Sequence, residues 1–113
     1  MRIKRRKKIR KFIVNKKTNL IVSDVGEISL KNNEHLTINV LNKKNEICAM
    51  NWGFYATSSI NSRLKKEGFI TALTKNSFNK LFVMIVHVKK RKQFSKYCKK
   101  EKIKVVKWLS KIK

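Results

Sequence analysis

Residues 81–88 read Leu-Phe-Val-Met-Ile-Val-His-Val, an almost unbroken apolar run that contains three valines and an isoleucine. A short run of this kind is typical of a strand that is covered on both faces. We therefore predict a strand here and expect it to occupy the middle of a sheet. The run is far shorter than the roughly 20 apolar residues that a membrane-spanning helix needs, so no such helix is expected.

Around this strand, the C-terminal two thirds of the chain alternates strands with helices. The expected order is strand, helix, strand, strand, helix, strand, over residues 47–52, 58–67, 69–74, 81–88, 90–101 and 103–109. This order is similar to the split βαβ arrangement of ferredoxin-like domains. The predicted fold class is therefore α+β, an antiparallel sheet with two helices, with the ferredoxin-like part over residues 47–109.

The first helix has signals at both of its ends. Thr57 or Ser58 is the expected N-cap, and Gly68 follows the helix where a left-handed residue is favoured. Ile60 and Leu64 lie one turn apart and form the expected buried face.

The N-terminal third predicts antiparallel β-hairpins. Short β-type runs are separated by turns rich in Asn, Asp or Gly. The runs cover residues 12–14, 20–23, 27–30 and 35–41, and the turns cover residues 15–19, 24–26 and 31–34. Because 113 residues is the usual size of one domain, we expect a single α+β domain over residues 12–113, with a β-hairpin part (12–45) and an alternating part (46–113).

The C-terminal segment over residues 103–112 fits two structures. Val105, Trp108 and Ile112 continue the helical phase of the preceding segment. Ile103 and Val106 do not fit this phase, and the segment is rich in β-branched residues. We prefer the strand, and the helix remains the alternative.

The charge of the chain is extreme. Thirty Lys and Arg residues face six Asp and Glu residues, which gives a formal net charge of +24. Such a protein attracts polyanions, so RNA or DNA is the expected partner, with an acidic protein or an anionic membrane surface as alternatives. The excess of Lys, Ile and Asn would also follow from a biased base composition of the coding sequence. The protein would then be an accessory, protein-interaction module, and its charge would carry no function.

Two cationic segments are candidate nucleic-acid-binding elements. Residues 2–11 (RIKRRKKIRK) hold eight cations and no acid, and we expect a flexible basic arm over residues 1–11. Four of its cations are arginines, whose planar groups pair with phosphate: Arg2, Arg5, Arg6 and Arg10. The second segment is the lysine face of the predicted helix over 90–101, opposite its apolar face. This face holds Lys92, Lys96, Lys99 and Lys100.

Aromatic and hydroxyl side chains crowd the predicted junction between the first strand and the first helix. Such a junction can hold a phosphate at the helix N-terminus and stack a base or sugar on an aromatic ring. The candidate anion or ligand site consists of Trp52, Tyr55, Thr57, Ser58 and Arg63. The interpretation that we favour is purely structural, with Trp52 and Phe54 in the core and Thr57 or Ser58 as a helix cap.

The sequence offers no arrangement typical of catalysis or metal binding. The six acidic residues show no paired spacing, and His35 and His87 are isolated. Cys48 and Cys98 stand fifty positions apart without a CxxC motif, and we expect both in the core. We therefore expect a non-catalytic protein without cofactor or metal. The basic start lacks the apolar stretch of a secretory signal, so a cytoplasmic location is expected.

Overall fold

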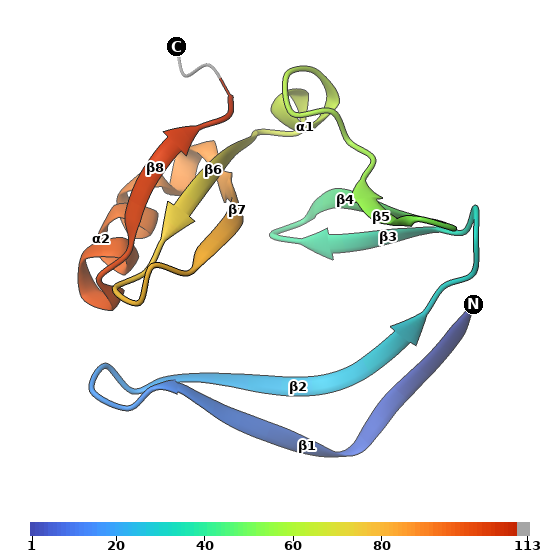
Figure 1. Ribbon diagram of the computed structural model, residues 1–113, viewed down its shortest axis with the longest axis horizontal. Helices are drawn as coiled ribbons and strands as arrows, with labels where there is room; N and C mark the ends of the chain where they lie inside the picture. Colours follow the sequence, from blue (N-terminus) through green and yellow to red (C-terminus); the bar gives the residue numbers. More distant parts are fainter. Residues whose placement is uncertain (111–113) are drawn as a thin grey trace.

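The computed structural model describes residues 1–110, which form three separate antiparallel sheets and two helices (Figure 1). The first sheet is a hairpin of β1 (Arg2–Asn15) and β2 (Leu20–Ser29). The second has the order β3 (His35–Val40), β4 (Lys43–Met50), β5 (Gly53–Ala56). The third has the order β7 (Leu81–His87), β6 (Phe69–Lys75), β8 (Lys104–Trp108). The helices are α1 (Arg63–Lys66) and α2 (Arg91–Glu101), with a 3-10 turn over Val88–Lys90 before α2.

This arrangement confirms an α+β fold but not the single sheet that we expected. The strand predicted over residues 47–52 corresponds to β4, which pairs with β3 on one side and β5 on the other. It makes no pairing with the third sheet, so the ferredoxin-like arrangement over residues 47–109 is not confirmed.

The main core lies around β6, the middle strand of the third sheet. Phe69, Ile70 and Ala72 are all buried, because β7 and β8 flank the strand. Helix α2 covers one face of this sheet, where the ring of Phe94 meets that of Trp108 edge to face at 5.9 Å. The prediction that residues 81–88 form the central strand is therefore wrong, since β7 is at the edge and most of its side chains are exposed.

The basic segment at the start of the chain is a strand rather than the flexible arm that we expected. β1 pairs with β2 through most of its length, and Arg5 and Arg10 flank an irregularity where β1 bulges. Across the strands, Asp24 and Glu27 supply the negative charge that lets cationic residues pack here. The predicted turn over residues 24–26 therefore lies inside a continuous β2.

The β1–β2 hairpin runs as an arc alongside the other two sheets (Figure 1), and each of its ends is tied to the rest of the chain by a side-chain contact. At one end the amino group of Met1 pairs with Glu34 at 2.9 Å, and at the other Asn15 donates to Glu101 at 3.0 Å. Apolar side chains of both strands stay largely exposed. The chain is correspondingly open, with a radius of gyration of 15.7 Å against about 13 Å for a compact domain of about 100 residues.

Around α1 and at the C-terminal end, the predictions are partly confirmed. Helix α1 is much shorter than the predicted 58–67 and begins after Ser62, so the expected cap at Thr57 or Ser58 is wrong. Gly68 does adopt a positive φ of 91°, and β8 confirms the preferred strand. Residues 111–113, which include the Ile112 of the helical alternative, lie outside the described residues.

Four further residues were predicted to be buried: Ile60, Leu64, Cys48 and Cys98. Leu64 is buried as expected, whereas Ile60 is exposed. Cys98 is buried in α2, while Cys48 is only half-buried in β4, and neither forms a disulfide. Burial raises the pKa of the Cys98 thiol, which therefore stays protonated.

Candidate functional site

Two of the four arginines of the basic segment form ion pairs with carboxylates. Arg6 binds Asp24 at 3.2 Å and Glu27 at 2.5 Å, and Arg10 binds the same Asp24 oxygen at 2.7 Å. The hydrogen bond from Arg10 is the main cause that holds the pKa of Asp24 below its usual range. Arg6 is the least exposed cation of the segment, so its main role is to hold the hairpin together.

The other predicted cations do not form one surface. Arg2 lies at the end of the hairpin that is far from α2, and Arg5 precedes the bulge. The lysine face of α2 is exposed on the opposite side of the molecule along its entire length: Lys92, Lys96, Lys99 and Lys100. Of these four, Lys100 is the one that lines a hollow together with the hairpin tip, which reaches the end of α2.

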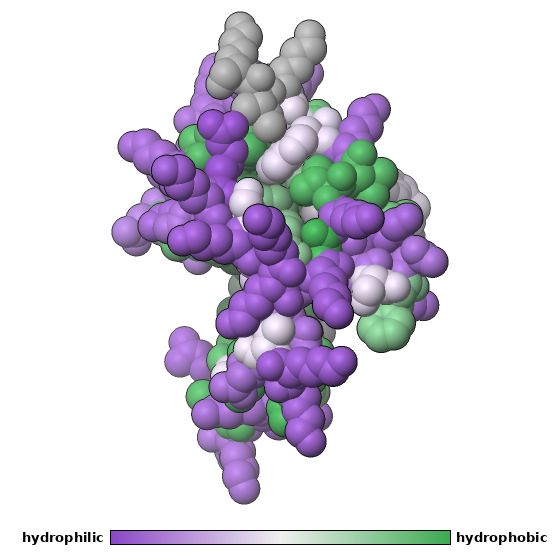
Figure 2. Space-filling model, turned by 90° about the vertical axis from the view of Figure 1, so that its left-hand side faces the viewer, coloured by the Kyte–Doolittle hydropathy of each residue, from purple (hydrophilic) through white to green (hydrophobic). Residues whose placement is uncertain are grey.

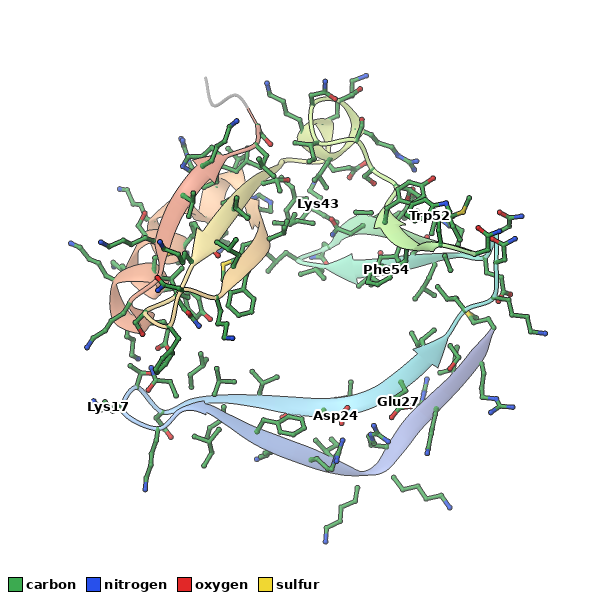
Figure 3. All side chains as sticks on the ribbon, in the orientation of Figure 1. Lys17, Asp24, Glu27, Lys43, Trp52 and Phe54 are labelled. Carbon is green, nitrogen blue, oxygen red and sulfur yellow. The ribbon has the colours of Figure 1, made fainter. Side chains whose placement is uncertain are left out.

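The aromatic side chains of the predicted junction are exposed, not buried. Trp52 is 69% exposed and Phe54 is 72% exposed, so the expectation that both belong to the core is wrong. Trp52 lies in the turn between β4 and β5, and Phe54 lies in β5, which is only four residues long. The rings of Trp52 and Tyr55 stack on each other, with centroids 6.0 Å apart (Figure 3).

The polar residues of that junction converge on a buried carboxylate. Arg63 donates to Glu46 at 2.6 Å, and the Thr57 hydroxyl lies 3.4 Å from the other Glu46 oxygen and 3.4 Å from His35. Ser58 is buried nearby and does not lie at a helix N-terminus. Glu46 thus occupies the position beside Arg63 that we expected an anion to take, which disfavours an anion site here.

A different cleft brings cations together from distant parts of the sequence. The turn between β1 and β2 meets the end of α2 and the turn between β6 and β7, and these three segments enclose a volume of about 610 Å³. We call this the tip cleft. Its charged and aromatic lining residues are Lys16, Lys17, Phe78, Phe82, Tyr97, Lys100, Glu101 and Lys102. Apolar side chains complete the lining: Val14, Leu20, Met84 and Ile103.

The electrostatics of the tip cleft favour an anion. Lys16, Lys17, Lys100 and Lys102, which we call the tip lysines, are all exposed and make no salt bridge with the described part of the chain. The one carboxylate that lines the cleft, Glu101, accepts a hydrogen bond from Asn15. Figure 2 looks onto this side of the molecule, where hydrophilic side chains cover much of both the α2 lobe and the hairpin tip.

Aromatic rings also line the tip cleft. Phe78 lies in the turn between β6 and β7 and is 81% exposed, and Phe82 at the start of β7 is 47% exposed. Tyr97 reaches the cleft from α2. Burial is the main cause that raises its pKa, so its hydroxyl stays protonated and can donate a hydrogen bond.

Of the tip lysines, sequence reasoning named only Lys100. Lys16 and Lys17 stood in a predicted turn, and Phe78 followed a strand as an isolated aromatic residue. One available signal was the presence of a large aromatic residue in the polar Asn-Ser-Phe-Asn-Lys turn over residues 76–80, where folding does not require it.

Comparisons with known proteins do not identify a family: no family model matches the chain, and no curated protein or solved structure is detectably similar to it. Within residues 1–110, no three His, Cys, Asp or Glu side chains are grouped so that they could hold a metal ion. No helix in the same part of the chain is long and apolar enough to span a membrane.

Proposed function

We propose that this protein binds a nucleic acid, RNA or DNA, in the tip cleft and along the adjoining lysine face of α2, without catalysing a reaction on it. The observation that carries this proposal is the convergence of the four tip lysines around a cleft whose single carboxylate is hydrogen-bonded to Asn15. A row of separate cations suits a polymer with regularly spaced phosphates better than a single small anion.

The lysine face of α2 extends this site. Lys99 and Lys100 occupy the last turn of the helix, where they also offset the partial negative charge of the helix C-terminus. Lys92 and Lys96 continue the exposed face away from the cleft. A nucleic-acid strand that leaves the cleft would therefore meet further cations along α2.

The experiment is a salt titration of nucleic-acid binding, measured by fluorescence anisotropy with labelled RNA and DNA oligonucleotides. We expect the affinity to fall steeply between about 50 and 200 mM salt, because counterions are released from each neutralised phosphate. The triple variant Lys16→Ala, Lys17→Ala, Lys100→Ala should weaken binding. It should also lower the slope of log K against log salt by about 2 to 3, since each of the three lost phosphate contacts contributes about 0.7 to 0.9.

A matched control separates the site from the overall charge. Lys44, Lys65 and Lys66 are exposed lysines in β4 and α1, on elements that do not line the tip cleft. Their triple alanine variant removes the same number of charges and should change the slope far less. Equal effects of the two triple variants, or an affinity that is insensitive to salt, would contradict the proposal.

A further inference from the structure

Building on the proposed function, we infer that the tip cleft selects single-stranded nucleic acid, whose unpaired bases stack on Phe78 and Phe82 while the tip lysines bind its phosphates. The inference depends on three features of the cleft: a rigid turn that presents one ring, a second ring on the neighbouring strand, and cations on both walls.

The turn that carries Phe78 is held by its own hydrogen bonds. The side-chain oxygen of Asn76 accepts the backbone N–H groups of Phe78 and Lys80, both at 2.9 Å. The turn is completed by Asn79, which adopts a positive φ of 61°, a conformation that Asn tolerates well. Because these contacts do not involve the Phe78 side chain, the turn holds the ring in solvent without needing it for its own stability.

Phe82 adds a second ring to the same cleft. It lies in β7, shortly after the turn, where its backbone carbonyl accepts a hydrogen bond from the Thr74 hydroxyl at 3.2 Å. About half of its side chain remains accessible. The Tyr97 hydroxyl, which stays protonated, lies on the α2 side and can donate to a base or to a phosphate.

The tip lysines stand on two walls around these rings. Lys16 and Lys17 come from the hairpin tip, and Lys100 and Lys102 come from the end of α2. Cations that follow the backbone, combined with aromatic rings that stack successive bases, characterise sites for single strands. In a duplex the faces of the bases are already stacked within the helix, so the two rings would have no partner there.

Competition between single and double strands tests this inference. Labelled single-stranded RNA, single-stranded DNA and a duplex DNA of the same mixed sequence are titrated with the wild-type protein and with Phe78→Ala and Phe82→Ala. The wild type should bind at least one of the single strands about tenfold more tightly than the duplex. Each alanine variant should lose about tenfold in affinity for that single strand. Duplex binding and the salt slope should stay unchanged, because no phosphate contact is removed. The RNA and DNA arms show which backbone is preferred.

Two further variants separate stacking from other effects. Phe78→Tyr keeps an aromatic ring and should bind as the wild type does. Phe54→Ala removes a similarly exposed ring from β5, in another sheet, and should also have no effect. The melting temperature of each variant is measured as well, to check that the variant is folded.

The possible failures are distinguishable. If the duplex binds as tightly as both single strands, or if Phe78→Ala and Phe82→Ala leave single-strand binding unchanged, the inference is wrong. Steep salt dependence that is sensitive to the tip lysines would then leave the proposed function standing. If no nucleic acid binds at low salt, the proposed function itself is wrong.

Discussion

Asn15 at the hairpin tip donates a hydrogen bond from its side-chain nitrogen to Glu101 near the end of α2, across 86 positions of sequence and a distance of 3.0 Å. Both side chains are half-buried. This contact joins the first sheet to the last helix at the tip cleft, which both residues line. The geometry of the proposed site therefore depends on a pair of residues that are not themselves expected to touch the ligand.

Asn15→Ala should loosen the hairpin tip. Losing the hydrogen bond should lower the free energy of unfolding by about 1 kcal/mol, the typical net value of such a bond. Amide hydrogen exchange measured by mass spectrometry should become faster over residues 16–20 than in the wild type. Asn32→Ala, which removes an exposed amide with no side-chain hydrogen bond to the described residues, is the control and should leave this exchange unchanged.

Gly26→Ala should disrupt the pairing of β1 with β2. A Cβ atom at this position would lie 2.5 Å from the backbone oxygen of Lys4, and a backbone atom cannot move aside as a flexible side chain can. Steric strain of this kind costs about 1 to 3 kcal/mol. Urea unfolding followed by circular dichroism measures the loss. Ser23→Ala, at an exposed position of the same strand, should be nearly neutral; equal stabilities of the two variants would refute the expected clash.

The stability of the hairpin should depend on pH through Asp24. Hydrogen bonds and charge interactions with Arg10 and Arg6 keep the pKa of this carboxyl below its ordinary value of 3.8 in the folded chain. Its stabilising contribution is therefore complete above the ordinary pKa and is lost as the pH falls through the lower, folded-state pKa. Asp24→Asn should melt at a lower temperature than the wild type at pH 7.

Melting temperatures of the wild type and of Asp24→Asn, measured from pH 7 down to acid pH, provide the internal control for this prediction. Below the folded-state pKa the wild-type carboxyl is protonated and resembles the amide, so the two melting temperatures should converge. A difference that stays constant from pH 7 to acid would show that the charge of Asp24 does not contribute.

Glu46→Ala should weaken the connection between β4 and α1. The carboxylate is largely buried and binds Arg63 and the Thr57 hydroxyl. The Arg63 side chain is mostly exposed, so solvent weakens its ion pair with Glu46. We therefore expect the free energy of unfolding to fall by about 1 kcal/mol. Chemical denaturation measures the loss, and the salt slope of nucleic-acid binding should not change. A variant that binds more weakly while remaining fully stable would instead place this cluster in the binding site.

Sequence periodicity identified the elements whose pattern is local. The predicted helix over 90–101 and the strands over 35–41, 69–74 and 81–88 match observed elements to within one or two residues. Such patterns depend on side chains only a few positions apart. They do not specify which strands pair, so the division into three sheets and the edge position of β7 could not be derived from them.

The basic segment shows why charge alone misled the prediction. Eight cations in ten residues predict repulsion and disorder, yet Asp24 and Glu27 neutralise part of that charge from the neighbouring strand. The tip cleft was even less accessible to prediction from the sequence. Its lysines belong to two segments that meet only when the hairpin lies against the end of α2, and that contact depends on the whole fold.

The position of β6 between its two partners also has a consequence for synthesis. β7 follows β6 directly, but β8 is made only after α2. While the chain is being translated, one side of the most buried strand therefore remains without a partner until Trp108 has left the ribosome. Until then the nascent protein exposes an open, apolar β-strand edge, a feature that promotes association with other chains and recruits chaperones.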